Sequence, residues 1–118
     1  RMIFGNDAPS GSGSIPLGIL RNICQVASVS DIPGEIALCM ATGNSAKVYN
    51  KLNTGIIAVG READLVFMDA PMGSVANTAV EAFECGDIPG LSIIMVDGVI
   101  KAAKSRNTPP CKRAAKVI

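Results

Sequence analysis

The chain has 118 residues, of which 48% are hydrophobic, 18% charged and 3% aromatic, and its net charge is +1. This composition excludes a disordered chain, and it gives no general reason to expect nucleic acid or a membrane as a partner. We expect a globular, cytoplasmic protein. No two of its four cysteines form a C-x-x-C pair and no His is present to complete a zinc site, so we expect reduced thiols, as is usual in a cytosolic protein.

The chain opens on a short apolar run, residues 2–5, followed by a polar turn at residues 6–9. This pattern predicts a buried strand that ends in a turn. Asp7 lies just past the strand, where catalytic groups gather in parallel α/β folds, although an Asn-Asp pair in this position is more often a turn former. Domains rarely begin inside their core, so we expect a portion of a longer protein.

A Gly/Ser-rich loop at residues 11–14 leads into the first predicted helix, with Ser14 as its cap and Pro16 in its first turn. Its apolar residues recur at helical spacing and should face a core: Leu17, Leu20, Cys24 and Ala27. The loop could instead bind phosphate through backbone N–H groups, but Pro16 stands where the dinucleotide fingerprint needs its third glycine.

Two further helices are predicted before residue 52. One begins near Pro33 and should bury Ile36, Ala37 and Met40. The other runs through residue 49 with Thr42 as its cap.

The pattern changes after residue 52 from helical spacing to short apolar runs. Strands are predicted at residues 56–58, 65–68, 93–96 and 99–101, and the last two flank an Asp97-Gly98 turn suited to a hairpin. A helix over residues 75–85 should be capped by Ser74 and closed by Gly86.

The remaining charged residues have plain structural interpretations. Asp64 and Asp69 are read as turn and strand-end carboxylates, exposed to solvent. The tail carries six basic residues and no acid between positions 101 and 118, which favours a solvated or docked segment over an anion-binding arm, because no aromatic residues interleave for base stacking.

The absence of histidine restricts the chemistry that this chain can perform. No Ser/His/Asp or Cys/His nucleophile pair can be assembled, and a catalytic zinc site normally needs three protein ligands, mostly His. Any metal site that includes Asp7 must therefore take its other ligands from outside this chain.

Two motifs resemble the ending of amidohydrolase-superfamily enzymes. Residues 41–49 (ATGNSAKVY) are similar to the helix that leaves the barrel in that family, and residues 54–66 (TGIIAVGREADLV) are similar to the segment that returns to its small β domain. Asn50-Lys51 stands where a single Gly is usual, and Val59 where Pro is usual. Both departures affect connector geometry rather than chemistry.

The resemblance implies an α/β fold: the end of a (β/α)8 TIM-like barrel at residues 1–51, and part of a small β-sandwich with the tail at residues 52–118. It implies a metal-dependent hydrolase that cleaves a C–N bond of a cyclic amide, active as a homo-oligomer and inactive as this chain alone. Asp7 would ligate a divalent metal, zinc or iron. It would also take a proton from a metal-bound water, whose pKa can fall to about 7, and pass it to the departing nitrogen.

Three alternatives stay open at this point. The first is another amidohydrolase, such as an imidazolonepropionase-like enzyme or a deaminase, because the substrate-selecting loops lie mostly elsewhere. The second is a non-catalytic interaction module that is complete at this length. The third is a phosphate-binding domain that uses residues 11–14.

Overall fold

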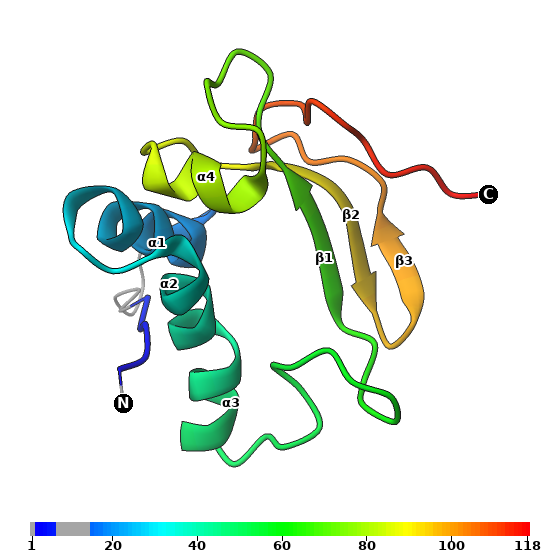
Figure 1. The fold of residues 1–118 in the computed structure, drawn as a ribbon. Helices are drawn as coiled ribbons and strands as arrows, with labels where there is room; N and C mark the ends of the chain where they lie inside the picture. Colours follow the sequence, from blue (N-terminus) through cyan, green and yellow to red (C-terminus); the bar gives the residue numbers. More distant parts are fainter. Residues whose placement is uncertain (1, 7–14) are drawn as a thin grey trace.

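The computed structural model describes residues 2–6 and 15–118, which form four helices and one small antiparallel sheet. The helices gather on one side of the molecule and the sheet stands on the other (Figure 1). The chain is therefore mixed α/β, as the sequence predicts. Within the described residues no helix is long and apolar enough to cross a membrane.

Helix α1 spans Gly18–Val29 and begins later than the sequence predicts. Its N-cap residue is Leu17, which has a left-handed backbone (φ 60°) and provides no side-chain capping bond. Because that conformation is incompatible with a helical turn, Pro16 precedes the helix instead of lying in its first turn. The predicted cap Ser14 lies outside the described residues. The predicted core face is confirmed at Cys24 and Ala27, which are buried, and at Leu20, which packs against the core cluster. Ile23 and Gly18 are also buried, whereas Leu17 precedes the helix.

Helix α2 spans Gly34–Ala41 and starts after Pro33, as predicted. Ala37 and Met40 are buried, but Ile36 is 50% exposed, so its predicted burial is wrong. Ile36 lies at the edge of the face that the other two residues define, because successive residues are turned by about 100° around a helix.

Helix α3 spans Gly43–Val48, close to its predicted position. Thr42 is the N-cap residue, but its side chain does not cap the helix. Its hydroxyl donates to the Leu38 carbonyl oxygen at 2.8 Å, at the C-terminus of the preceding helix. Only Thr42 separates the two helices, so the Leu38 carbonyl oxygen lies within reach of its hydroxyl and competes with the capping bond.

The sheet consists of β1 (Leu65–Asp69), β2 (Gly90–Val96) and β3 (Val99–Ala102), antiparallel in the order β1-β2-β3. These strands confirm the predictions at 65–68, 93–96 and 99–101. The strands predicted at residues 2–5 and 56–58 are not formed. An apolar run becomes a strand only when a neighbouring strand pairs with it, and none of the described strands lies beside these two segments.

The hairpin between β2 and β3 has the predicted two-residue turn. Val96 pairs with Val99, and the two residues between them, Asp97 and Gly98, both have positive φ (50° and 72°). Two successive left-handed residues make a type I′ turn, which fits the twist of the flanking strands.

Helix α4 spans Ala79–Glu84, four residues shorter at its start than the sequence predicts. The cap is Thr78, whose hydroxyl accepts from Glu81 N at 3.1 Å, while the Glu81 carboxylate accepts from Asn77 N at 2.8 Å. This is a variant of the capping box. Ser74 instead accepts from the backbone N of the second residue after it, within a local turn. Gly86 (φ 86°) follows the end of the helix, as predicted.

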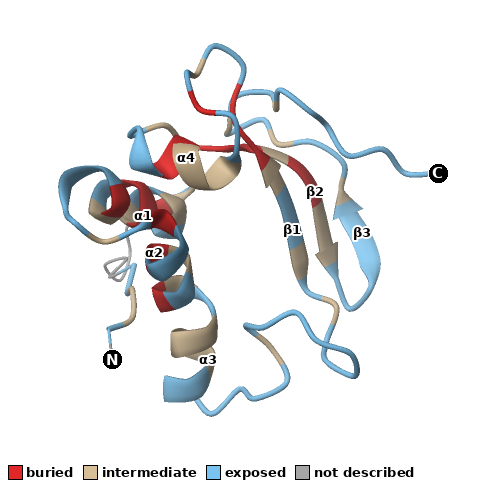
Figure 2. Cartoon of the chain, in the orientation of Figure 1, coloured by how far each residue is buried: buried red, intermediate tan, exposed pale blue. Residues whose placement is uncertain are grey.

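The core lies where α4 meets the other helices (Figure 2). Phe83 of α4 is fully buried in a cluster with residues of α1 and α2: Ile23, Cys24, Ala27 and Ala37. The next residue back, Ala82, belongs to a second cluster with Ala70 and Ala76 beside the end of β1. Helix α4 thus packs on both parts of the molecule: Phe83 contacts the other helices, and Ala82 contacts residues that follow β1.

Candidate functional site

The residues that precede Asp7 are held against the helices by contacts spread along their length. Asn44 Nδ2 of α3 donates to the Met2 carbonyl oxygen at 3.1 Å, and Asn22 Nδ2 of α1 donates to the Gly5 carbonyl oxygen at 3.0 Å. Between these two points, the Phe4 side chain packs against the core cluster. The helices thus supply the polar and apolar partners that fix residues 2–6.

Asn6 occupies the space beside the first residue of α1. A Cβ atom built on Gly18 would overlap the amide group of the Asn6 side chain, so a larger residue at position 18 would require that side chain to move. Asn6 is the last described residue before Asp7. Asp7 itself and the loop at residues 11–14 lie outside the described residues, so the predicted roles of both stay predictions.

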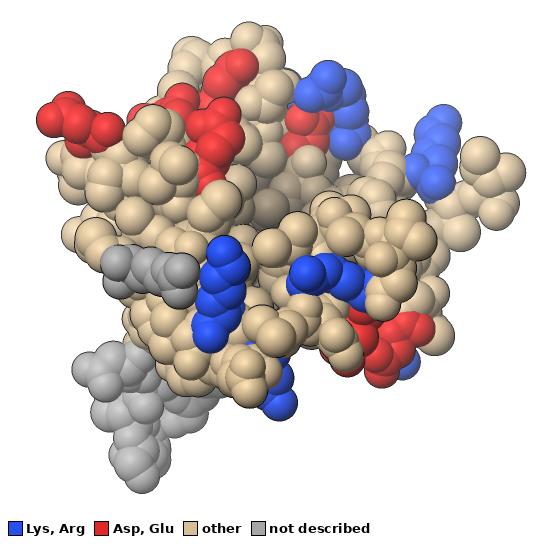
Figure 3. Space-filling view, turned by 60° about the horizontal axis from the view of Figure 1, so that its bottom comes forward, with Lys and Arg blue, Asp and Glu red and all other residues tan. Residues whose placement is uncertain are grey.

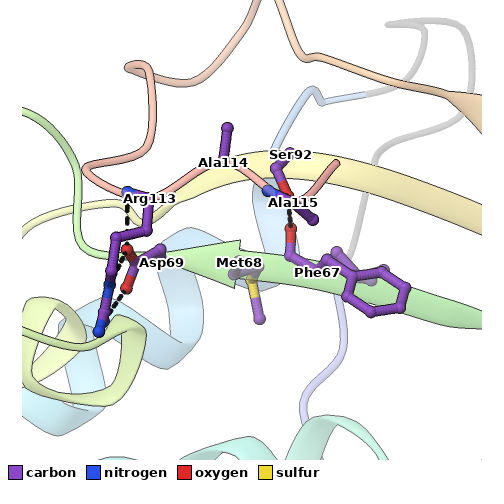
Figure 4. Close-up of a pocket in the computed structure, with 8 residues that line it drawn as sticks. Phe67, Met68, Asp69, Ser92, Arg113, Ala114 and Ala115 are labelled. Atoms are coloured by element: carbon purple, nitrogen blue, oxygen red, sulfur yellow. Dashed lines mark hydrogen bonds and ion pairs between the residues drawn. The ribbon is translucent and has the colours of Figure 1, made fainter. Parts of the chain in front are cut away.

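The second polar site anchors the C-terminal segment on the sheet (Figure 4). The Asp69 carboxylate, at the end of β1, accepts from Arg113 Nε at 2.8 Å, from Arg113 Nη2 at 2.7 Å and from the Arg113 backbone N at 2.9 Å. This is a bidentate ion pair with an added main-chain bond. The prediction that Asp69 is a solvated strand-end carboxylate is wrong, because the residue is only 7% exposed.

The ion pair sets the charge state of both groups. The hydrogen bond from the Arg113 guanidinium, more than any other cause, lowers the pKa of Asp69 from 3.8 to about 2. The same bond raises the pKa of Arg113 above its usual value. Asp69 is therefore ionised at every physiological pH, which suits an anchor and not a group that exchanges protons.

More contacts dock the tail, as one of the two structural interpretations predicts. Lys112 Nζ donates to the Ala76 carbonyl oxygen at 2.7 Å, and its backbone N donates to the Ala70 carbonyl oxygen at 2.8 Å. Further along, the Ala115 backbone N donates to Ser92 Oγ at 3.3 Å. On the face shown in Figure 3, basic and acidic side chains lie in small separate groups on a mostly uncharged surface.

An open groove of about 490 Å³ runs between β1 and this tail (Figure 4). Its polar side chains are already engaged: Asp69 pairs with Arg113, and Ser92 Oγ donates to the Phe67 carbonyl oxygen at 3.4 Å. Backbone atoms and apolar side chains supply the rest of its lining. The hydrogen bonds around the groove hold the tail in place, and the described residues that line it present no free acid, base or nucleophile.

The other aspartates and the cysteines singled out in the sequence show no sign of a catalytic role. Asp64 Oδ1 accepts from Asp97 N at 2.9 Å, which braces the hairpin turn and fits the predicted turn role of both residues. All four cysteines are free, as predicted. Burial, and after it the charge of Asp87, raises the pKa of the Cys24 thiol, so this thiol is poorly reactive.

Comparison with known proteins places these features in a family context. No family model matches the chain. Over all 118 residues it is 65% identical to the enamidase of Eubacterium barkeri, and over 113 residues it is 30% identical to adenine deaminase 2 of Desulfotalea psychrophila. The chain spans 30% of the length of the first relative and 17% of the second.

The structure gives the same result as the sequence. The crystal structure of enamidase, described as a new member of the amidohydrolase superfamily, matches this chain with a TM-score of 0.94 at 65% identity. The match covers 100% of this chain and 30% of the enamidase chain.

Proposed function

Because this chain is homologous to part of enamidase, a member of the amidohydrolase superfamily, we propose that it forms the C-terminal portion of a hydrolase that opens a cyclic amide. The observation that carries the proposal is the 65% identity over the whole chain, together with the TM-score of 0.94. In this proposal residues 1–51 end a (β/α)8 barrel, and residues 52–118 belong to a small β domain and the tail.

Asp7 is the residue of this chain that we propose for the chemistry. Its carboxylate would accept a proton from the water that attacks the amide carbon, and would return that proton to the departing nitrogen. Its position in the chain supports the role, because it directly follows a segment that the helices hold at Met2, Phe4 and Gly5.

The described residues of this chain do not supply enough ligands for a complete metal site. Residues 2–6 and 15–118 contain no group of three His, Cys, Asp or Glu side chains that could hold a metal ion, and the sequence has no His. Since a catalytic zinc site needs about three protein ligands, Asp7 would provide one ligand to a divalent ion, zinc or iron. The other ligands would come from outside this chain.

A deaminase is the second candidate, because the chain is 30% identical to an adenine deaminase over 96% of its own length. The two activities require different substrates, a cyclic enamide in one case and adenine in the other. Identity of 65% against 30% favours the cyclic amide.

A chimaera tests the proposal. This sequence would replace the matching segment of the Eubacterium barkeri enamidase, and hydrolysis of the parent enzyme's enamide substrate would be followed by absorbance, with adenine as the competing substrate. We expect an enamide-specific enzyme. Asp7→Asn should lower kcat by roughly 10²–10⁴-fold, the usual contribution of general acid–base catalysis, without loss of fold.

Asp64→Asn is the matched control, since the amide oxygen of Asn can still accept the bond from Asp97 N. It should leave kcat within about twofold. A folded but inactive chimaera would contradict the proposed function, and near-normal turnover by Asp7→Asn would contradict the proposed role of that residue.

A further inference from the structure

The turn between β2 and β3 contains an aspartate followed by a glycine, a pair that is prone to spontaneous rearrangement. Asp97 is the only one of the six aspartates in the sequence that a glycine follows. Because glycine has no Cβ beside its nitrogen, the Gly98 nitrogen can attack the Asp97 side chain with little steric hindrance. Both residues are exposed, so water and a modifying enzyme can reach them.

The rearrangement exchanges one main-chain bond for another and leaves the mass of the chain unchanged. The Gly98 nitrogen bonds to Cγ of the protonated Asp97 carboxyl, and the carboxyl hydroxyl leaves with the N–H proton as water. This step closes a cyclic succinimide. Water then adds to the ring carbonyl that was the Asp97 main-chain carbonyl and breaks its bond to the Gly98 nitrogen. The chain now runs through the Asp97 side chain, as isoaspartate, with an extra main-chain carbon.

Two hydrogen bonds to the segment that leads into β1 oppose this reaction. Gly98 N donates to the Ala63 carbonyl oxygen at 3.1 Å, and Asp97 N donates to Asp64 Oδ1 at 2.9 Å. Because a peptide group is planar, the group between Asp97 and Gly98 must rotate as a unit before its nitrogen can reach Cγ. That rotation takes the Gly98 N–H away from Ala63. The attacking atom is thus held in a bond that the reaction must first break.

We propose that Asp97-Gly98 is a latent isomerisation site, which Ala63 and Asp64 keep unreacted in the folded chain. The reaction needs a local opening of the turn, so its rate follows the fraction of time in which the two bonds are broken. Isoaspartate lengthens a two-residue loop whose size fits the pairing of β2 with β3. The site therefore acts as an age-dependent switch, and β3 loses its pairing in molecules that have isomerised.

The test compares the original chain with Asp64→Ala during prolonged incubation at mildly acidic pH, where part of the Asp carboxyl is protonated. Isoaspartate is measured by methylation with an L-isoaspartyl methyltransferase. Electron-transfer fragmentation, which cleaves isoaspartate at its extra carbon, gives the amount at position 97. The substitution removes the acceptor of one bond, so we expect isomerisation about fivefold faster, the ratio that corresponds to one net hydrogen bond.

Asp64→Asn is the matched control, because its amide oxygen can still accept from Asp97 N. It should isomerise within about twofold of the original chain. The second reference is the original chain unfolded in guanidinium chloride, which makes neither bond. It should isomerise at least about tenfold faster than the folded chain. This comparison decides the proposal even if Asp64→Ala does not fold.

Faster isomerisation in folded Asp64→Ala than in Asp64→Asn supports the proposal. Equal rates in these two variants overturn the role of Asp64, and equal rates in the folded and unfolded original chain overturn the protection of the turn. If the unfolded chain forms no isoaspartate at position 97, the assignment of the site itself fails. Amide exchange at residues 100–102 should be faster in the isomerised fraction, and unchanged exchange there would overturn the switch.

Discussion

Replacing Asp69 by Asn tests how strongly the C-terminal segment is held to the sheet. The substitution keeps the shape of the side chain, removes its charge and replaces one of the two accepting oxygens by an NH2 donor, so the ion pair and at least one hydrogen bond to Arg113 are lost. The fall of the Asp69 pKa from 3.8 to about 2 corresponds to roughly 2–2.5 kcal/mol. Because the Arg113 side chain is 72% exposed and solvent screens it, we expect a loss of about 1–1.5 kcal/mol at pH 7.

The sign of the pH dependence follows from the direction of the shift. A carboxyl group whose pKa is lowered by folding contributes stability that is complete above its unfolded value, near 3.8, and is lost as pH falls through about 2. The difference between the original chain and Asp69→Asn should therefore shrink between about pH 4 and pH 2.

Urea unfolding followed by circular dichroism at pH 7 and at pH 2.5 measures this difference. Tryptophan fluorescence is not an option, since the chain has no Trp. Lys116→Ala removes another exposed tail cation and should change the free energy of unfolding by less than about 0.5 kcal/mol. An equal effect of Asp69→Asn at both pH values, or no effect at pH 7, would refute an ionic anchor.

Three further substitutions test the helices by the same unfolding assay. Thr78→Ala should cost about 1 kcal/mol by removing the N-terminal cap of α4. Thr42→Ala should cost less than half as much, because its hydroxyl bonds a carbonyl oxygen that already accepts from the Thr42 backbone N and caps no helix N-terminus. Equal costs would contradict the capping assignment. Phe83→Ala should cost about 3–5 kcal/mol and should also speed amide exchange around Ile23 in α1, since the two side chains share one cluster. Exchange that changes in α4 alone would mean that Phe83 and Ile23 do not support one another in a shared cluster.

The parts of the fold that depend on local chemistry could be predicted from the sequence. The hairpin follows from Asp97-Gly98, two residues that tolerate positive φ, and α2 follows from the proline at its start. The start of α4 also has a local signal, because Thr78 and Glu81 have capping-box spacing. Ser74, four residues earlier, offers a competing cap, and this is why the predicted helix begins too early.

What the sequence could not reveal depends on contacts between distant residues. Asp69 and Arg113 are 44 positions apart, so neither the burial of the carboxylate nor the docking of the tail follows from a local pattern. The same holds for Asn22 and Asn44, whose partners are 17 and 42 positions away. The proposed role of Asp7 rests on the resemblance to a family, since composition alone favours a turn former at this position.

The placement of Phe83 has a consequence for how this protein is made. Helices α1 and α2 are synthesised well before the side chain that completes their core. Ribosomes add about 5–20 residues per second, so the 42 residues between positions 41 and 83 take about 2–8 s. During that interval Ile23 and Ala37 lack the Phe83 side chain that shares their cluster in the folded chain, so the core of α1 and α2 can close only once α4 has been synthesised.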